Sequence, residues 1–111
     1  MKFTELSNRV IGCAIEVHRV LGPGLLESAY EHCLARELEL QRLKYARQQA
    51  MPVEYKGITL DCGYRADIIV ENEIILELKC VDKLMGIHEA QLLTYMRLSK
   101  IKQGYLINFN E

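Results

Sequence analysis

The chain has 111 residues, of which 50% are hydrophobic and 26% are charged, and its formal net charge is −1. This length and composition fit one folded domain with a single core, residues 1–111, and exclude a disordered chain. The charge excludes a strongly basic nucleic-acid-coating protein, but it is compatible with an acidic cleft that has a basic rim. No apolar run reaches the roughly 20 residues of a membrane span, and the N-terminus lacks a signal-peptide core. We therefore expect a cytoplasmic protein with no membrane partner.

The four cysteines lie far apart in the sequence and form no CxxC pair: Cys13, Cys33, Cys62 and Cys80. Scattered thiols in a cytosolic chain are usually small core residues. Their spacing, alone or with the three histidines, is not that of a zinc site. We expect neither disulfides nor a zinc centre.

Residues 4–21 carry apolar side chains at three- and four-residue steps, which predicts an amphipathic helix of roughly five turns. The run Gly22-Pro23-Gly24 should end it. His18 lies one position beyond the apolar stripe, near the helix C-terminus. This position fits a histidine that interacts with the helix dipole, and it also fits a histidine that faces a cleft.

A second helix is predicted over residues 25–40. Its expected core line consists of Leu26, Ala29, Cys33 and Leu38. A neighbouring stripe at i, i+3, i+4 and i+7 consists of Glu27, Tyr30, Glu31 and Leu34. The position of Glu27 in the first turn is explained by the helix dipole alone, and equally by a carboxylate that points into a buried site.

A basic stretch begins with Arg42, Lys44 and Arg47 and leads into residues 51–55, which read as a strand. Pro52 would restrict that strand to a sheet edge or place it at the strand's start. Lys56-Gly57 then predicts a turn, after which residues 58–60 resume strand character.

Residues 64–80 predict a β-hairpin, because apolar residues alternate on both sides of the polar run Glu71-Asn72-Glu73. A two-residue turn would mix the two faces, whereas a three-residue loop pairs Val70 with Ile74 and Asp67 with Glu77. We therefore expect Asp67 and Glu77 to be direct cross-strand neighbours, with Lys79 on the same side.

Two carboxylates this close are unfavourable unless a divalent cation, a shared proton or a nearby lysine offsets their charge. Carboxylate oxygens are ligands that Mg²⁺ and Mn²⁺ prefer, and the Leu78 carbonyl would add another oxygen. A metal ion would lower the pKa of a bound water, and Lys79 would orient that water or stabilise a phosphate. The alternative is a salt-bridge set on a solvated sheet face.

A third helix is predicted over residues 87–99. Its expected apolar line consists of Ala90, Leu93, Met96 (or Leu92) and Leu98. A second line of His88, Gln91 and Tyr95 would be a solvated surface. Residues 104–109 predict a last strand. The order α-α-β-β-β-α-β indicates an α/β (α+β) fold, with an additional N-terminal helix over residues 1–22 and a core over residues 24–109.

The spacing of Asp67 and Glu77-x-Lys79 on a hairpin between helices resembles the PD-(D/E)XK nuclease superfamily. The run GLLESAY at residues 24–30 is similar to the motif of its GxxExxY branch, and the runs EVHRVLGPGLLESAY, RADIIVENEIILELK and HEAQLLTY also resemble that branch. The resemblance implies a three-layer, restriction-endonuclease-like core with a mixed central sheet flanked by helices. It also implies a Mg²⁺- or Mn²⁺-dependent nuclease without an organic cofactor that acts on nucleic acid.

Carried over residue by residue, the resemblance makes Glu27, Asp67 and Glu77 the metal ligands and Lys79 the catalytic lysine. Gln91 and Tyr95 match a Gln-x-x-x-Tyr element that supports the site in the recombination-exonuclease branch. The other residues within these motifs are supporting candidates without a firm role: Tyr30, His18 and His88. Candidate phosphate contacts are Arg42, Lys44, Arg47, Arg65 and Lys100.

Two features depart from the superfamily pattern. Ala66 stands where proline often precedes the aspartate, and the chain stops at Glu111, earlier than expected of relatives. A partner that completes the fold, a homodimer or a larger assembly are therefore alternatives. A catalytically silent nucleic-acid- or protein-binding module with the same fold is the rival function.

Overall fold

The computed structural model describes residues 4–110. The helices are α1 (Glu5–Leu21), α2 (Glu27–Leu40) and α3 (Gly86–Ser99). The strands are β1 (Tyr45–Ala50), β2 (Val53–Tyr55), β3 (Ile58–Leu60), β4 (Arg65–Val70), β5 (Ile74–Lys79) and β6 (Gln103–Asn108). None of the helices in this part of the chain has the length and apolar character needed to cross a membrane.

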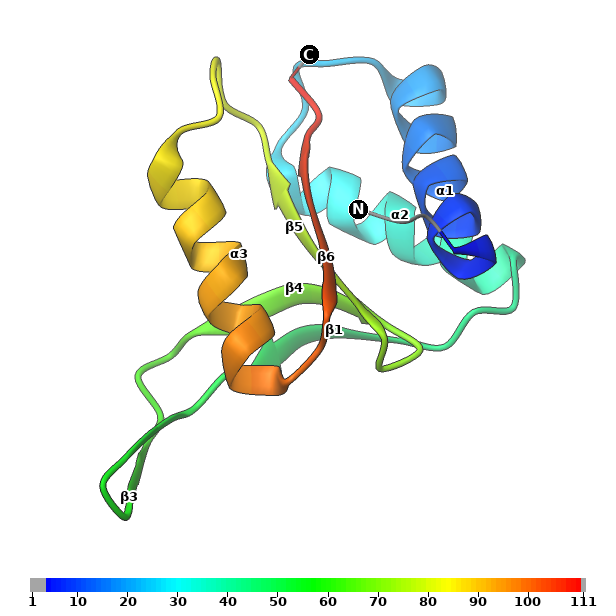
Figure 1. Cartoon of the computed structure of the whole chain (residues 1–111). Coiled ribbons are helices and arrows are strands. Elements are labelled where there is room, and N and C mark those ends of the chain that lie inside the picture. Colours follow the sequence, from blue (N-terminus) through cyan, green and yellow to red (C-terminus); the bar gives the residue numbers. More distant parts are fainter. Residues whose placement is uncertain (1–3, 111) are drawn as a thin grey trace.

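The main sheet has the strand order β1-β4-β5-β6. Strands β1, β4 and β5 pair antiparallel, whereas β6 pairs parallel to β5 after the crossover through α3. Figure 1 shows α1 and α2 on one side of this sheet and α3 on the other. The predicted mixed α/β fold with helices on both faces is confirmed.

Each face of the sheet has its own core. On one face, residues of β4 and β5 such as Ile68, Val70 and Leu76 pack with Val10 of α1 and Leu34 of α2. On the other face, Ile69 and Ile75 pack with Leu92 and Tyr95 of α3. Since β4 and β5 are covered on both faces, their residues are apolar on both sides, and residues 74–78 are all buried.

The predicted hairpin register is confirmed, with Val70 opposite Ile74 and Ile68 opposite Leu76. Glu71 and Asn72 in its loop both have positive φ, 53° and 55°. The predicted end of α1 is also correct, because Gly22 caps the helix with φ 66°.

The strand predicted over residues 51–55 is present in part, as β2 (Val53–Tyr55), but β1 was not predicted. The strand that pairs with β4 is β1, which lies earlier in the chain. β1 is an edge strand of sequence YARQQA and buries none of its residues fully, so it lacks the apolar alternation by which strands are predicted. Strands β2 and β3 pair only with each other in the described structure.

The expected core lines of α2 and α3 are confirmed only in part. Leu38 of the α2 line and Leu92 of the α3 line are in the core, with Cys33, Met96 and Leu98 packed against it. Leu26 and Leu93 are not, since they are 77% and 53% exposed. α2 instead buries the stripe that follows Glu27, which contains Tyr30, Glu31 and Leu34, and α3 buries Tyr95 with Leu92. The two lines that contain candidate site residues therefore face the sheet.

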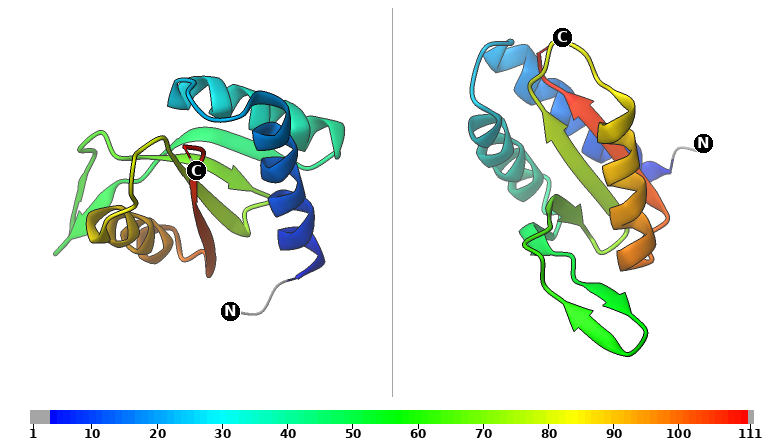
Figure 2. Two further views of the ribbon diagram at one scale, coloured as in Figure 1. Left: turned by 90° about the horizontal axis from the view of Figure 1, so that it is seen from above. Right: turned by 90° about the vertical axis from the view of Figure 1, so that its left-hand side faces the viewer.

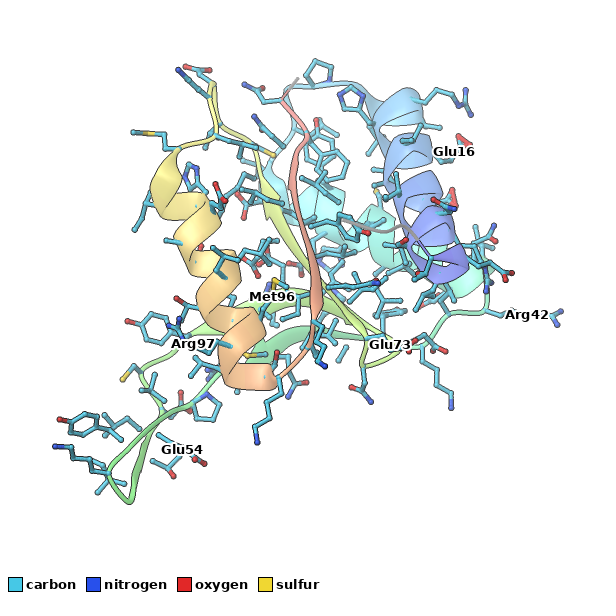
Figure 3. All side chains as sticks on the ribbon, viewed as in Figure 1. Glu16, Arg42, Glu54, Glu73, Met96 and Arg97 are labelled. Atoms are coloured by element: carbon cyan, nitrogen blue, oxygen red, sulfur yellow. The ribbon has the colours of Figure 1, made fainter. Side chains whose placement is uncertain are left out.

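Strands β2 and β3 form an arm that projects from the body of the protein (Figure 2, right). Its turn places Lys56 and Gly57 at φ 43° and 88°, the pattern of a two-residue hairpin turn. Glu54 lies on this arm, well away from the sheet (Figure 3).

Gly104 of β6 permits a close approach of α3 to the sheet. A Cβ atom there would lie 2.7 Å from Met96 Sδ and 2.9 Å from Leu92 Cδ1. We expect Gly104→Ala to lower the free energy of unfolding by about 1–3 kcal/mol, measured by urea denaturation. The matched control is Gly12→Ala at an open, exposed position of α1, which should stabilise the protein by about 0.5–1 kcal/mol. Equal effects of the two alanines would contradict this packing.

Candidate functional site

The candidate site lies where strands β4 and β5 separate. Within these strands the backbone pairing runs from Val70–Ile74 to Ile68–Leu76 and ends one residue before the expected Asp67–Glu77 pair. Beyond this point β4 continues to pair with β1, and β5 with β6, so the sheet remains continuous on both sides of the fork.

The carboxylates of Asp67 and Glu77 close the fork with side-chain hydrogen bonds. The Leu78 N–H donates to Asp67 Oδ2 over 2.8 Å, and the Asp67 N–H donates to Glu77 Oε1 over 2.9 Å. Each carboxylate thus satisfies a backbone donor on the opposite strand. The structure brings these two predicted site residues together, with a bonding pattern that the sequence did not suggest.

Glu77 is only 2% exposed. Burial is the main cause that raises the pKa of its carboxyl to about 7; the carboxylates of Asp67 and Glu27 act in the same direction, and the Asp67 N–H and Lys79 oppose them. Burial is also the main cause that raises the pKa of Asp67, with Glu31 acting in the same direction. The site therefore concentrates more negative charge than its own surroundings stabilise.

Glu27 lies at the rim of the site as the first residue of α2, and it is exposed to solvent. Desolvation by the surrounding protein raises the pKa of its carboxyl, Lys79 lowers it, and Asp67 raises it. These mutual effects place Glu27 within electrostatic reach of Asp67, Glu77 and Lys79. The interpretation in which Glu27 belongs to the candidate site is therefore favoured over the helix dipole alone.

Tyr30 fixes the loop that leads to Glu27. Its hydroxyl donates to the Gly22 carbonyl and accepts a hydrogen bond from Leu25 N–H at 3.2 Å. Its ring stacks on Phe109 with centroids 4.5 Å apart and an interplanar angle of 3°. Tyr30 is fully buried and supports the site through the position of α2.

Lys79 is held from the other side of the sheet by α3. Its Nζ donates to Gln91 Oε1 at 3.4 Å, and Gln91 Nε2 donates to the Tyr95 hydroxyl at 3.0 Å. Tyr95 is 2% exposed. The line of Gln91 and Tyr95, expected on the helix surface, therefore points to the site.

Three residues of the site were not predicted to contribute in the way that they do. Glu31 is buried and accepts from Arg47 Nη2 at 2.8 Å and from Gln48 Nε2 at 2.6 Å. Gln48 Nε2 also lies 3.3 Å from Asp67 Oδ1. The stripe that Glu31 shares with Glu27 could have revealed it, whereas nothing in the sequence distinguishes Gln48.

The backbone of β1 is irregular next to Asp67. Gln48 has φ 51°, and the pairing with β4 passes from Arg47–Ile68 to Gln49–Ala66 without a Gln48–Asp67 pair. A positive φ at a non-glycine residue costs of order 1–3 kcal/mol and is typical of functional sites. This irregularity turns the Gln48 side chain towards Glu31 and Asp67. Arg47, predicted to contact phosphate, forms an ion pair with Glu31 instead of facing solvent alone.

The two histidines lie in different places. His18 lines a separate apolar cavity of about 560 Å³ between α1 and β6, with its ring 6.3 Å from Phe109, away from the fork. His88 Nδ1 accepts the Met85 N–H at 2.9 Å at the start of α3. His88 also acts electrostatically to lower the pKa of the Glu27 carboxyl, so it lies near the rim of the site.

Three of the predicted basic residues lie at the hairpin-loop end of the sheet, opposite the fork. The Lys44 N–H donates to Glu71 Oε2 at 2.7 Å, and Lys100 lines a hollow with Asn72 and Glu73. The side chain of Arg42 extends away from the body of the protein (Figure 3). Val70 at the loop end of β4 and Asp67 at the fork are three residues apart, so about 10 Å separates these two ends of the hairpin. Arg65 lies nearer the fork, where it pairs with Asp61 at 3.2 Å.

The donor chemistry of the site fits a hard divalent cation. The carboxylates of Glu27, Asp67 and Glu77 supply only oxygen, and each carboxylate oxygen that accepts one N–H keeps a second lone pair. Burial is the main cause that raises their pKa values and repulsion between carboxylates adds to it, and a cation would offset both effects. Among residues 4–110, no three acidic, histidine or cysteine side chains converge into a ready-made metal centre, so binding requires these side chains to move closer together.

Comparison with known proteins gives one match. The family model described as the PD-(D/E)XK nuclease superfamily matches residues 4–111. Neither the curated proteins nor the solved structures contain a significant match to the chain. The matched region includes the fork, α2 with Glu27, and α3 with Gln91.

The burial of Glu77 predicts a pH-dependent stability in the metal-free protein. Its pKa rises from 4.5 to about 7 on folding, so the folded state retains a proton that the unfolded state loses. The protonated Glu77 carboxyl therefore contributes about 3 kcal/mol to the free energy of unfolding. This contribution is complete below pH 4.5 and is lost as the pH rises through 7. With a chelator present, the free energy of unfolding should therefore fall less between pH 5 and about 8 in Glu77→Gln than in the wild type.

Glu73→Gln, which changes an exposed carboxylate in the hairpin loop, is the control and should follow the wild type. An identical pH dependence in Glu77→Gln and in the wild type would contradict the burial of an ionisable carboxyl in the fork.

Proposed function

The chain belongs to the PD-(D/E)XK nuclease superfamily, and on this basis we propose that it is a metal-dependent nuclease that hydrolyses phosphodiester bonds in nucleic acid. The observation that supports this most is the fork, in which Asp67 and Glu77 lie between separated strands beside Lys79. A salt-bridge set on a solvated sheet would not bury Glu77 almost completely.

Glu27, Asp67 and Glu77 would hold Mg²⁺ or Mn²⁺, with the Leu78 carbonyl as a further oxygen. Such a cation supplies Lewis-acid chemistry, since it polarises a phosphate oxygen and lowers the pKa of water. The raised pKa values of the three carboxyls support this role, because a cation would favour their ionised forms.

Lys79 would stabilise negative charge at the scissile phosphate. The hydrogen bonds from Tyr95 through Gln91 to Lys79 Nζ limit where the ammonium group can lie. An ammonium group that is already in position before the reaction costs less reorganisation free energy, when negative charge develops on the phosphate, than a mobile one. Gln91 and Tyr95 are therefore positioning residues.

Glu31, Arg47 and Gln48 would hold Asp67 from the α2 side. Their hydrogen bonds fix the Gln48 amide, which lies against Asp67 Oδ1. Arg47 neutralises Glu31, which would otherwise add to the negative charge next to Asp67. Asp67 is thus restrained by a backbone N–H on one side and an amide on the other.

We further propose that the chain belongs to the GxxExxY branch, which Gly24, Glu27 and Tyr30 support, since Tyr30 fixes the loop that carries Glu27. A cytoplasmic location is supported by four cysteines that are all unpaired thiols. A homodimer or a larger assembly would extend the small surface available to a nucleic-acid substrate. Sizing in solution tests that proposal.

Cleavage assays with variants test the proposed activity. We expect the wild type to cut labelled DNA or RNA in the presence of Mg²⁺ or Mn²⁺ and to lose activity in a chelator. Lys79→Ala should lower the cleavage rate by about 100-fold or more, because charge stabilisation of this kind contributes 10²–10³ to the rate. Asp67→Ala should abolish cleavage.

The matched control is Lys102→Ala, which removes an exposed lysine just before β6. It should cut like the wild type. Equal cleavage rates in the wild type, Lys79→Ala and Asp67→Ala would assign the activity to another site or a contaminant. In that case, the silent binding module is the better account.

A further inference from the structure

A neutral groove adjoins the site along α3. It has a volume of about 430 Å³ and lies between one stripe of α3 and the base of the β2–β3 arm, where Val53 and Tyr64 line it. From Ile87 to Leu98 the groove follows α3 for roughly 17 Å, at 1.5 Å per residue. It is long enough to hold an extended segment rather than a single small molecule.

The groove is built for an uncharged, flat ligand group. No Asp, Glu, Lys or Arg occurs among its described lining residues. Its walls are mostly apolar or aromatic, and its polar groups come from His88, Gln91 and Thr94. The Gln91 amide is already bonded to Lys79 and Tyr95. Phosphate groups would find no cationic partner of the usual kind there, whereas a base offers an apolar face and a polar edge.

Tyr64 is the aromatic side chain of this groove that remains available to a ligand. It is 49% exposed, and its ring is tilted by 59° relative to that of Tyr95, with the centroids 6.5 Å apart. Ile87, at the other end of the groove, is 71% exposed. Large apolar groups that stay exposed along one groove usually mark a binding surface.

The groove is continuous with the proposed catalytic machinery, because Gln91 and Tyr95 belong to both. A nucleotide in the groove would therefore lie next to Lys79. We propose that the groove binds an unpaired nucleobase on Tyr64, and that the substrate is single-stranded nucleic acid or an unpaired strand end; this substrate class rests on the proposed nuclease function. A paired base within a duplex has both faces covered by its neighbours and cannot stack on Tyr64.

Binding of oligonucleotides to the Lys79→Ala protein in Mg²⁺ tests this inference, because cleavage in this variant should be slow enough for binding to be measured first. The probes are a single strand that contains 2-aminopurine, whose fluorescence is quenched by stacking, and the same strand in a blunt duplex. We expect tighter binding and quenching with the single strand. Adding Tyr64→Ala should weaken that binding by about 5- to 150-fold and remove the quenching, whereas Tyr64→Phe should retain both.

Tyr55→Ala is the matched control, because Tyr55 is 59% exposed on the arm but does not line the groove. It should bind like its parent. The inference is overturned if the single strand does not bind, if Tyr64→Ala retains affinity and quenching, or if Tyr55→Ala loses as much as Tyr64→Ala.

Cleavage of the same two probes by the protein with Lys79 intact separates the two proposals. Binding that depends on Tyr64 without any cleavage would support the groove and contradict the nuclease function. Cleavage of the duplex that is indifferent to Tyr64→Ala would support the nuclease function and contradict the groove.

Discussion

The arrangement of the candidate site depends on two hydrogen bonds that cross the fork. The Leu78 N–H donates to Asp67, and the Asp67 N–H donates to Glu77. Backbone donors inside a protein must find acceptors, and here the sheet ladder no longer supplies them. The two carboxylates replace it, so the strands can separate without leaving these N–H groups unsatisfied. Because the carboxylates take the place of the ladder hydrogen bonds, two acidic side chains lie next to each other in a largely buried position.

The burial of this charge explains most of the surrounding polar structure. An ionised carboxylate that is buried away from water needs hydrogen-bond donors or a cation as partners. Glu77 has too few of them to keep its usual pKa, which burial raises to about 7. Lys79 lowers the pKa of Glu77, and α3 orients Lys79 through Gln91 and Tyr95. On the opposite face of the sheet, Arg47 and Gln48 satisfy Glu31, which would otherwise worsen the repulsion.

Most of the fold could be predicted from the sequence, because the hairpin alternates regularly and only one loop length keeps its faces consistent. The side of the helices that faces the candidate site could not be predicted from periodicity. Periodicity assigns apolar residues to the core, so it placed Leu26 and Leu93 inside, left the direction of Glu27 open and took the line of Gln91 for helix surface. A helix that faces a polar site reverses this rule. β1 was missed for a related reason, since Arg47 and Gln48 serve the site rather than a core.

The measurement that tests the central claim most directly is a calorimetric titration of the metal-stripped protein with Mn²⁺. The account predicts saturable binding in the wild type, loss of that binding in Asp67→Ala, and normal binding in Glu73→Ala at the opposite end of the same hairpin. Absence of binding in the wild type, or unchanged binding in Asp67→Ala, would contradict a metal site in the fork.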